Sequence, residues 1–149
     1  MLIGQFEVIL TQKGRLAVPA RFRHELGQRL VVTKWVEGCL VVISEERLNE
    51  ILTRLLGRKD LSQLSVRETE RFILGSAFEI ELDSQGRFVV PQILKEYGRL
   101  AGEVIFVGLG DRVEIWNREL WEKKEKVLQV EVAKYTEKLA EQISGKGGD

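Results

Sequence analysis

An internal repeat with a period of 72 residues constrains this chain more than any other feature. Shifting the sequence by 72 aligns residues 6–19, FEVILTQKGRLAVP, with residues 78–91, FEIELDSQGRFVVP, and seven of the fourteen positions are identical. A looser match continues along both copies. Units of this size have too little apolar surface to form a good core alone. We therefore expect two halves that interleave around one shared core.

Each copy is predicted to contain a strand, a turn, a second strand, a short helix and two further strands. The first strands are rich in β-branched and aromatic residues, and each turn places a glycine where a positive φ is needed. Pro19 and Pro91 suit the first turn of a helix, because the amide hydrogen that proline lacks has no partner there. Gly27 and Gly98 are expected just past the ends of these helices.

Two helices are predicted between the repeats. Ser44 is a plausible N-cap, and an apolar stripe with helical spacing follows it until Gly57. The segment SVRE at 65–68 has the spacing of a capping box and predicts a second helix that ends near Leu74. The stripe of the first helix consists of Leu48, Ile51, Leu52, Leu55 and Leu56.

A long C-terminal helix is predicted after Asn117, which can cap it. Its apolar residues follow spacings of four, three and four. This pattern fits a coiled-coil seam between subunits, but a single helix that lies on its own domain is the more common case. The residues concerned are Leu128, Val132, Tyr135 and Leu139.

Positive charge is concentrated in one segment of a chain whose formal net charge is zero. Residues 12–34 contain six basic residues and one acid, Glu25, whereas residues 44–74 are balanced. The planar guanidinium of arginine suits phosphate oxygens and guanine edges, so this distribution indicates nucleic acid as a partner. The basic residues are Lys13, Arg15, Arg21, Arg23, Arg29 and Lys34.

Other classes of site find little support in the sequence. His24 is the only histidine and Cys39 the only cysteine, which excludes the common zinc sites and any internal disulfide. We expect Cys39 to be a packed side chain, and we expect no catalytic residue, cofactor, metal or small-molecule substrate. The N-terminus lacks the features of a signal peptide, and no apolar run is long enough to span a bilayer. A cytoplasmic protein without a membrane partner is therefore expected.

The motif D-x-x-G-R-x-x-x-P, written twice about 70 residues apart, resembles the MraZ family of bacterial transcriptional regulators. The resemblance covers nearly the whole chain and includes KGRLAVPARFRHELG, EGCLVVISEE, LDSQGRFVVPQILKEYG and RVEIWNRELWE. It implies an α+β fold, mainly β, in which two AbrB-like repeats interleave into a swapped-hairpin β-barrel with peripheral helices. The implied division is repeat 1 at 5–47, a helical connector at 48–76, repeat 2 at 77–120, and a C-terminal helix and tail at 121–149.

The resemblance also implies a function. Members of the family regulate the division and cell-wall gene cluster and bind short direct repeats in their own promoter. They bind DNA as homo-oligomeric rings. Binding to DNA places the protein at the nucleoid, and covering the promoter favours repression. DNA contact in the family maps to the G-R motif and the helix after it. Position by position, this implicates Lys13, Arg15, Arg21 and Arg23 in the first copy, and Arg87 and Lys95 in the second.

The two copies depart from the family pattern in different ways. Thr11 stands where the family favours an acid, whereas the second copy keeps Asp83. If that acid orients the arginine or stiffens the turn, Arg15 should be held differently from Arg87. The second copy is also less basic, because Ile93 and Glu96 occupy the positions of Arg21 and His24. We therefore expect the first copy to dominate DNA binding.

Two alternatives remain open at this point. In one, the chain is an oligomeric scaffold without DNA, and its arginines meet an acidic protein partner. The zero net charge and the long C-terminal helix favour that interpretation modestly. In the other, the chain is an antitoxin-like regulator of the same fold, although such proteins are usually dimers of a single repeat.

Overall fold

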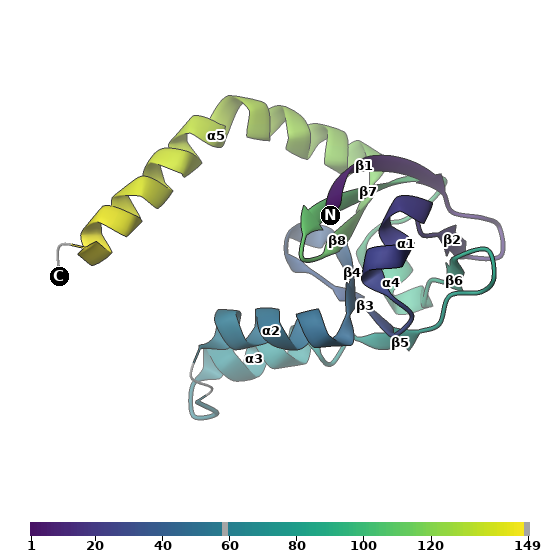
Figure 1. Ribbon diagram of the computed structural model, residues 1–149, viewed down its shortest axis with the longest axis horizontal. Helices are drawn as coiled ribbons and strands as arrows, with labels where there is room; N and C mark the ends of the chain where they lie inside the picture. Colours follow the sequence, from purple (N-terminus) through teal and green to yellow (C-terminus); the bar gives the residue numbers. More distant parts are fainter. Residues whose placement is uncertain (58–59, 148–149) are drawn as a thin grey trace. The chain divides into compact units, whose positions relative to one another are not determined.

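Both repeats contribute strands to one antiparallel sheet of the computed structural model (Figure 1). The structure describes residues 1–57 and 60–147. The strand order is β1-β7-β8-β4-β3-β5, so strands from opposite ends of the sequence lie side by side. The strands in this order are Leu2–Ile9, Glu103–Gly110, Val113–Asn117, Leu40–Ser44, Leu30–Lys34 and Phe78–Ile80.

Each repeat gives its first strand to the other repeat. All eight residues of β1 pair with β7, and β5 pairs in turn with β3. The return strands β2 (Arg15–Ala17) and β6 (Arg87–Val89) pair with each other in a separate two-stranded sheet, the β2–β6 ribbon. The interleaving predicted from the repeat is confirmed, as is the α+β class. Among the described residues, the pairing of the larger sheet runs as an open ladder from β1 to β5.

The shared core lies between the ribbon, the larger sheet and two short helices. Leu16 of β2 and Phe106 of β7 are fully buried, as are Phe22 and Leu94 from the helices. Phe22 also makes an edge-to-face contact with Phe6 of β1, with 5.1 Å between ring centroids. Each fully buried side chain of this size stabilises the fold by about 1.5–3 kcal/mol relative to an exposed one. Both halves therefore depend on the same apolar cluster.

The short helices α1 (Ala20–Leu26) and α4 (Gln92–Tyr97) begin directly after Pro19 and Pro91, as predicted. Gly27 follows α1 with a φ of 80°. Gly98 follows α4 with an ordinary φ of −77°, and the left-handed residue is its neighbour Arg99, at 52°. The predicted helix ends are thus confirmed.

The connector between the repeats contains α2 (Glu45–Leu56) and α3 (Leu64–Ile73), which extend from the sheet in Figure 1. The prediction that Ser44 caps α2 is confirmed, since its hydroxyl accepts a hydrogen bond from the Arg47 amide at 3.3 Å. Leu55, by contrast, is 57% exposed, so the apolar stripe is only partly buried. The predicted capping box at 65–68 is wrong, because the N-cap of α3 is Gln63, two residues before Ser65, and it makes no side-chain cap; the predicted end near Leu74 is confirmed.

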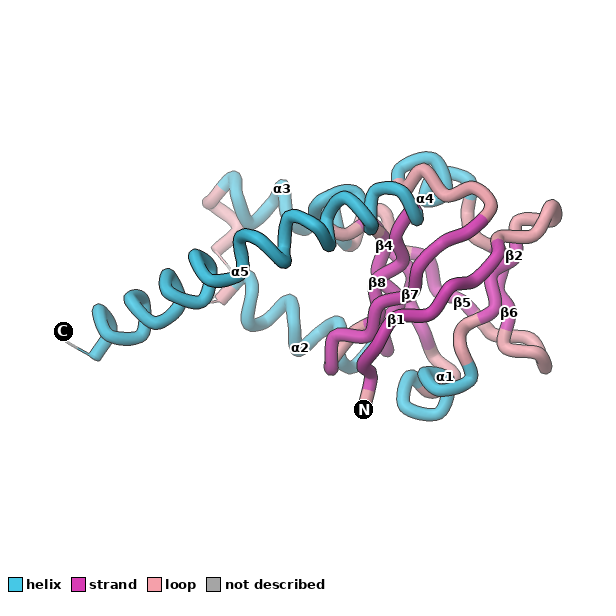
Figure 2. Tube along the Cα trace, turned by 90° about the horizontal axis from the view of Figure 1, so that it is seen from above, coloured by secondary structure: helices cyan, strands magenta, loops and turns pink. Residues whose placement is uncertain are grey.

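The long helix α5 (Arg118–Gly147) belongs almost entirely to a second compact unit, Glu119–Asp149, separate from Met1–Arg118. Figure 2 shows it as one continuous helix. Asn117 immediately precedes it, as predicted, and its side-chain amide donates to the Arg99 carbonyl at 2.7 Å. Val132, Tyr135 and Leu139 are each at least half exposed. Within the described residues, no helix combines the length and apolar character needed to cross a membrane.

A substitution at Gly108 tests the exchange of strands between the repeats. A β-carbon on this β7 residue would lie 2.6 Å from the Ile3 nitrogen and 2.7 Å from the Leu2 carbonyl carbon of β1. Gly108→Ala should therefore push β1 away and lower the free energy of unfolding by about 1–3 kcal/mol in urea titrations. The exposed neighbour Leu109 provides the control, since Leu109→Ala should change that energy by less than about 0.5 kcal/mol. Equal stability of Gly108→Ala and the wild type would contradict the close approach.

Candidate nucleic-acid interface

The β2–β6 ribbon has one face in the core and one face toward solvent. Leu16 and Phe88 are directly paired, and both are buried. Because side chains alternate along a strand, their neighbours Arg15 and Arg87 lie on the opposite face. Both arginines are half-buried, and Val89, the pairing partner of Arg15, is 57% exposed. The fold thus brings the two motif arginines onto one outer surface, although they are far apart in the sequence.

The turns that lead into the ribbon have the same backbone conformation in both repeats. Gly14 and Gly86 both have a φ of 76°, in the left-handed region that favours glycine. In the first turn the Gly14 amide donates to the Thr11 carbonyl at 2.9 Å, and in the second the Gly86 amide donates to the Asp83 carbonyl at the same distance. Positive φ at both glycines was predicted and is confirmed. Differences between the turns therefore come from their side chains.

The first residue of each turn makes different hydrogen bonds to the motif arginine of that turn. The Asp83 carboxylate accepts hydrogen bonds from the amides of Gln85 and Arg87 and also from the Arg87 Nε, each at 2.9 Å. Among the described residues, the Thr11 hydroxyl accepts a single hydrogen bond, from the Arg15 amide at 3.1 Å. Thr11 thus stabilises the turn through the Arg15 backbone amide, and its hydroxyl does not bond the Arg15 guanidinium. The expectation that Arg15 is held differently from Arg87 is confirmed.

The Asp83 carboxyl group titrates abnormally because of these bonds. The Arg87 amide contributes most, and the Arg87 guanidinium and the Gln85 amide add to it, so the pKa of Asp83 lies below its ordinary value of 3.8. Asp83 and Arg87 are both more than one-third exposed, and a surface ion pair of this kind contributes little stability. Its main effect is to orient Arg87 and to neutralise its charge.

Arg23 contacts the turn of the other repeat. Its Nε donates to the Val18 carbonyl at 2.7 Å, and its guanidinium lies where a β-carbon of Gly86 would be, with the Nε only 2.1 Å from that position. Arg23 and Gly86 also line one surface hollow together with Asp83. Lys95 is the counterpart of Arg23, but space is open beside Gly14. Arg23 therefore supports the second turn, whereas no described residue lies within 4 Å of the same position at Gly14.

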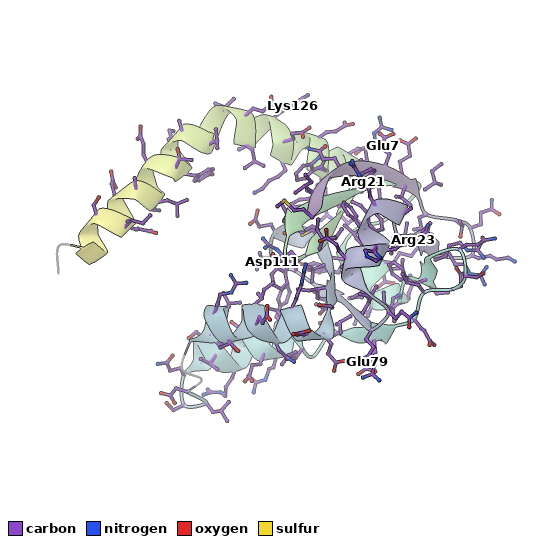
Figure 3. The ribbon with its side chains drawn as sticks, in the orientation of Figure 1. Glu7, Arg21, Arg23, Glu79, Asp111 and Lys126 are labelled. Atoms are coloured by element: carbon purple, nitrogen blue, oxygen red, sulfur yellow. The ribbon has the colours of Figure 1, made fainter. Side chains whose placement is uncertain are left out.

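This contact could not be predicted from the sequence, because Arg23 and Gly86 belong to different repeats. Only the exact path of the interleaved chain brings them together. Arg23 is half-buried, whereas Arg21 on the same helix is exposed. Figure 3 shows that both labelled arginines of α1, Arg21 and Arg23, project from the same short helix.

Positive charge remains unpaired on the first repeat. Lys13 and Arg21 are exposed, and Arg15 is half-buried. Within residues 1–57 and 60–147, no carboxylate lies within ion-pair distance of these three side chains or of Lys95. The first repeat therefore offers cationic groups to a ligand, whereas the motif arginine of the second repeat is already neutralised.

Residues considered for other chemistry have structural surroundings. Burial and the nearby Glu114 and Glu37 raise the pKa of the Cys39 thiol, in that order of importance, and its Sγ contacts the Val36 carbonyl oxygen at 3.4 Å. A buried, protonated thiol is unreactive, as expected from the sequence. In the part of the chain that the structure describes, no cluster of three histidine, cysteine or acidic side chains could hold a metal ion.

The fold and the site together define an internally duplicated α+β protein with exchanged strands and a cationic turn in its first half. Comparison with known proteins agrees with this class. Residues 1–72 and 73–142 each match the family described as "MraZ protein, putative antitoxin-like". The chain belongs to the MraZ family.

Relatives named "Transcriptional regulator MraZ" match over most of their length. The protein from Caldanaerobacter subterraneus subsp. tengcongensis is 40% identical over 93% of this chain and 96% of its own. The one from Thermoanaerobacter pseudethanolicus is 40% identical over 95% and 98%, and that from Leuconostoc mesenteroides subsp. mesenteroides is 42% identical over 81% and 84%. The functional class of this chain is therefore transcription regulation. Transcriptional regulators are not typically enzymes.

The charge of Asp83 makes a testable contribution to stability. Its pKa is lower in the folded than in the unfolded chain, so the unfolded state binds more protons in acid. We expect Asp83→Asn to be less stable than the wild type at neutral pH. The difference should shrink as the pH falls through the ordinary aspartate pKa of 3.8 and below it. Urea unfolding of both proteins across this range measures it, and a difference that does not change with pH would contradict the role of the charge.

Proposed function

We propose that this chain is a sequence-specific DNA-binding repressor that reads its target with the turn of the first repeat. The observation that carries the proposal is the unpaired positive charge of Lys13, Arg15 and Arg21 on the first repeat, with Arg15 on the exposed face of the β2–β6 ribbon. Membership of a family of transcriptional regulators supports it independently. The proposed ligand is double-stranded promoter DNA.

The ribbon gives the proposal a geometry. A two-stranded β-ribbon can enter the major groove of B-DNA, where guanine presents two acceptors to an arginine fork. Arg15 lies on the outward face of such a ribbon, so it is the residue we assign to base contacts. Lys13 in the turn and Arg21 on α1 would contact phosphates on either side of it.

The other three predicted site residues take smaller roles in this proposal. The Nε of Arg23 is already bonded to Val18, so only its terminal nitrogens would reach a phosphate. The Nε of Arg87 is held by Asp83, whose carboxylate offsets the positive charge, so we assign Arg87 a weaker contact than Arg15. Lys95 is half-buried on α4 and would contribute long-range attraction. The first repeat thus dominates binding.

Repression would require several subunits. One turn with a few cationic groups binds DNA weakly, whereas subunits in a homo-oligomeric ring raise each other's effective concentration on repeated sites. We therefore propose that the protein binds short direct repeats in its own promoter, within the division and cell-wall gene cluster, and blocks transcription by covering them. Such a protein would act in the cytoplasm, at the nucleoid.

Arg15→Ala tests the assignment of base reading. We expect the variant to keep its thermal stability, because the Thr11 hydroxyl bonds the backbone amide of residue 15 and not the guanidinium. Its affinity for the upstream promoter region should fall by about 1–3 kcal/mol relative to competitor DNA. Gel shifts with excess nonspecific DNA measure this. Arg71→Ala is the matched control, since Arg71 is an exposed arginine of the connector paired with Glu68.

Salt dependence separates base contacts from phosphate contacts. The logarithm of affinity should fall linearly with the logarithm of salt, with a slope of about −0.9 for each phosphate neutralised. We expect Lys13→Ala and Arg21→Ala each to make that slope shallower by about 0.9. Binding of promoter DNA that ignores salt would contradict the phosphate contacts. A folded oligomer that shifts no promoter fragment would instead favour the alternative of a scaffold with an acidic protein partner.

A further inference from the structure

The helix α5 carries a stripe of large apolar side chains that its own unit leaves largely exposed. Four such residues recur at spacings of four, three and four, so they lie on one face of the helix. Val132, Tyr135 and Leu139 are 50%, 52% and 58% exposed, and Leu128 is half-buried. A continuous stripe of this kind differs from the isolated apolar side chains of an ordinary surface and indicates a contact with another molecule.

Polar residues bound this stripe, and charged residues flank it. The stripe occupies the two seam positions of a heptad repeat, and the same positions are polar on either side of it, at Glu125 and Gln142. One of the two flanks of the seam carries Glu131 and Lys138, which are seven residues apart and opposite in sign. In coiled coils such flanking charges determine which helices pair and in which direction.

We propose that the stripe of α5 pairs with the same stripe of a second copy of this chain, in an antiparallel coiled coil. In this register Leu128 faces the partner's Leu139, and Val132 faces the partner's Tyr135. The polar residues that bound the stripe then face each other as well. The contact is two-fold symmetric, so one surface serves both subunits. The helix pair goes beyond the proposed function and forms without DNA.

Charge complementarity selects this register. In it Glu131 lies beside the partner's Lys138, and by symmetry Lys138 lies beside the partner's Glu131. Sliding one helix by a heptad sets either Lys138 beside the partner's Lys138 or Glu131 beside the partner's Glu131. A parallel pair sets these charges beside the partner's Thr136 and the partner's Ile143, which are uncharged. Of these arrangements, the proposed one alone gains two attractive pairs.

Neither flanking charge is committed to a strong contact within the chain. Glu131 pairs with Lys134 of the same helix at 3.1 Å, but the Lys134 side chain is 78% exposed, and such surface pairs contribute little. Among the described residues, no carboxylate lies within ion-pair distance of Lys138. Both side chains are therefore available to a second helix.

The pair has a defined effect on the assembly. One pair with four apolar layers is weak, whereas several pairs that join the same two oligomers act together through effective concentration. A two-fold contact cannot by itself close a ring, because cyclic rings are built from heterologous contacts. Pairing of α5 would thus join two of the proposed rings, or two subunits where no ring forms. In both cases association doubles the mass.

The first test reverses the flanking charges in the full chain, without DNA, and follows the mass by light scattering over a range of concentrations. Glu131→Lys and Lys138→Glu each make both attractive pairs repulsive, so the half-mass form should persist to at least about fivefold higher concentration than in the wild type. An equimolar mixture of the two variants restores both attractive pairs and should return the midpoint to within about twofold of the wild type. Glu137→Lys and Lys126→Glu are the matched controls, because they make the same changes at exposed positions of α5 away from the stripe (Figure 3 labels Lys126).

Two results of this test would overturn the inference. In one, the single variants associate at the same concentration as the wild type and the controls. In the other, the mixture associates no better than its components, which would mean that the stripe has another partner or another direction. Weakened single variants together with a restored mixture support the antiparallel pair.

The second test removes the apolar contact and keeps the helix. Leu139→Lys disrupts two of the four layers and should raise the midpoint of association at least about tenfold. Val130→Lys is the matched control, since Val130 is 77% exposed on α5 and lies away from the stripe. Lysine is a good helix former at both positions. Equal midpoints for the two variants would contradict a contact through the stripe.

A distance measurement tests the direction of the pair. A spin label on Lys123→Cys should lie more than about 30 Å from its copy in an antiparallel pair, because position 123 then faces the partner's Ser144, and within about 20 Å in a parallel one. The native Cys39 is buried and should not take the label. The distance that belongs to the pair is the one that Leu139→Lys abolishes. If that distance is about 20 Å or less, the antiparallel pair is wrong.

Discussion

The reciprocal pairing of strands between the repeats is the constraint on which the rest of this structure depends. β1 completes the sheet of the second repeat, β5 that of the first, and β2 and β6 pair only with each other. Neither half can then satisfy its backbone hydrogen bonds or bury its apolar face without the other. The same exchange carries Arg15 and Arg87 to one surface, so the candidate interface is a product of the fold's topology.

The interface also illustrates how one side chain can change a site while the backbone stays the same. Two turns with matching hydrogen bonds present arginines in opposite states, one paired and one unpaired. The difference comes from a carboxylate in place of a hydroxyl at the first residue of the turn. The two halves therefore differ more in available positive charge than the number of basic residues in each would suggest.

The turns, the helix starts and the difference between the two motif arginines could be predicted from the sequence, because the two copies of the repeat can be compared position by position. The shared glycines and prolines fixed the turns and helix starts, and the identity of Thr11 against Asp83 pointed to different arginines. The capping box at 65–68 failed because its spacing is a local pattern, whereas the start of α3 depends on packing. The contact of Arg23 with Gly86 could not be foreseen, since it joins the two repeats through the precise course of the chain.

The internal duplication has a consequence for how such a site can evolve. In a symmetric dimer of single repeats, any change at the first residue of the turn occurs twice, so both arginines are released or both are held. Joining the repeats in one chain removes that restriction. Each copy can then accumulate its own substitutions, and one can keep the architecture stable while the other acquires new binding preferences.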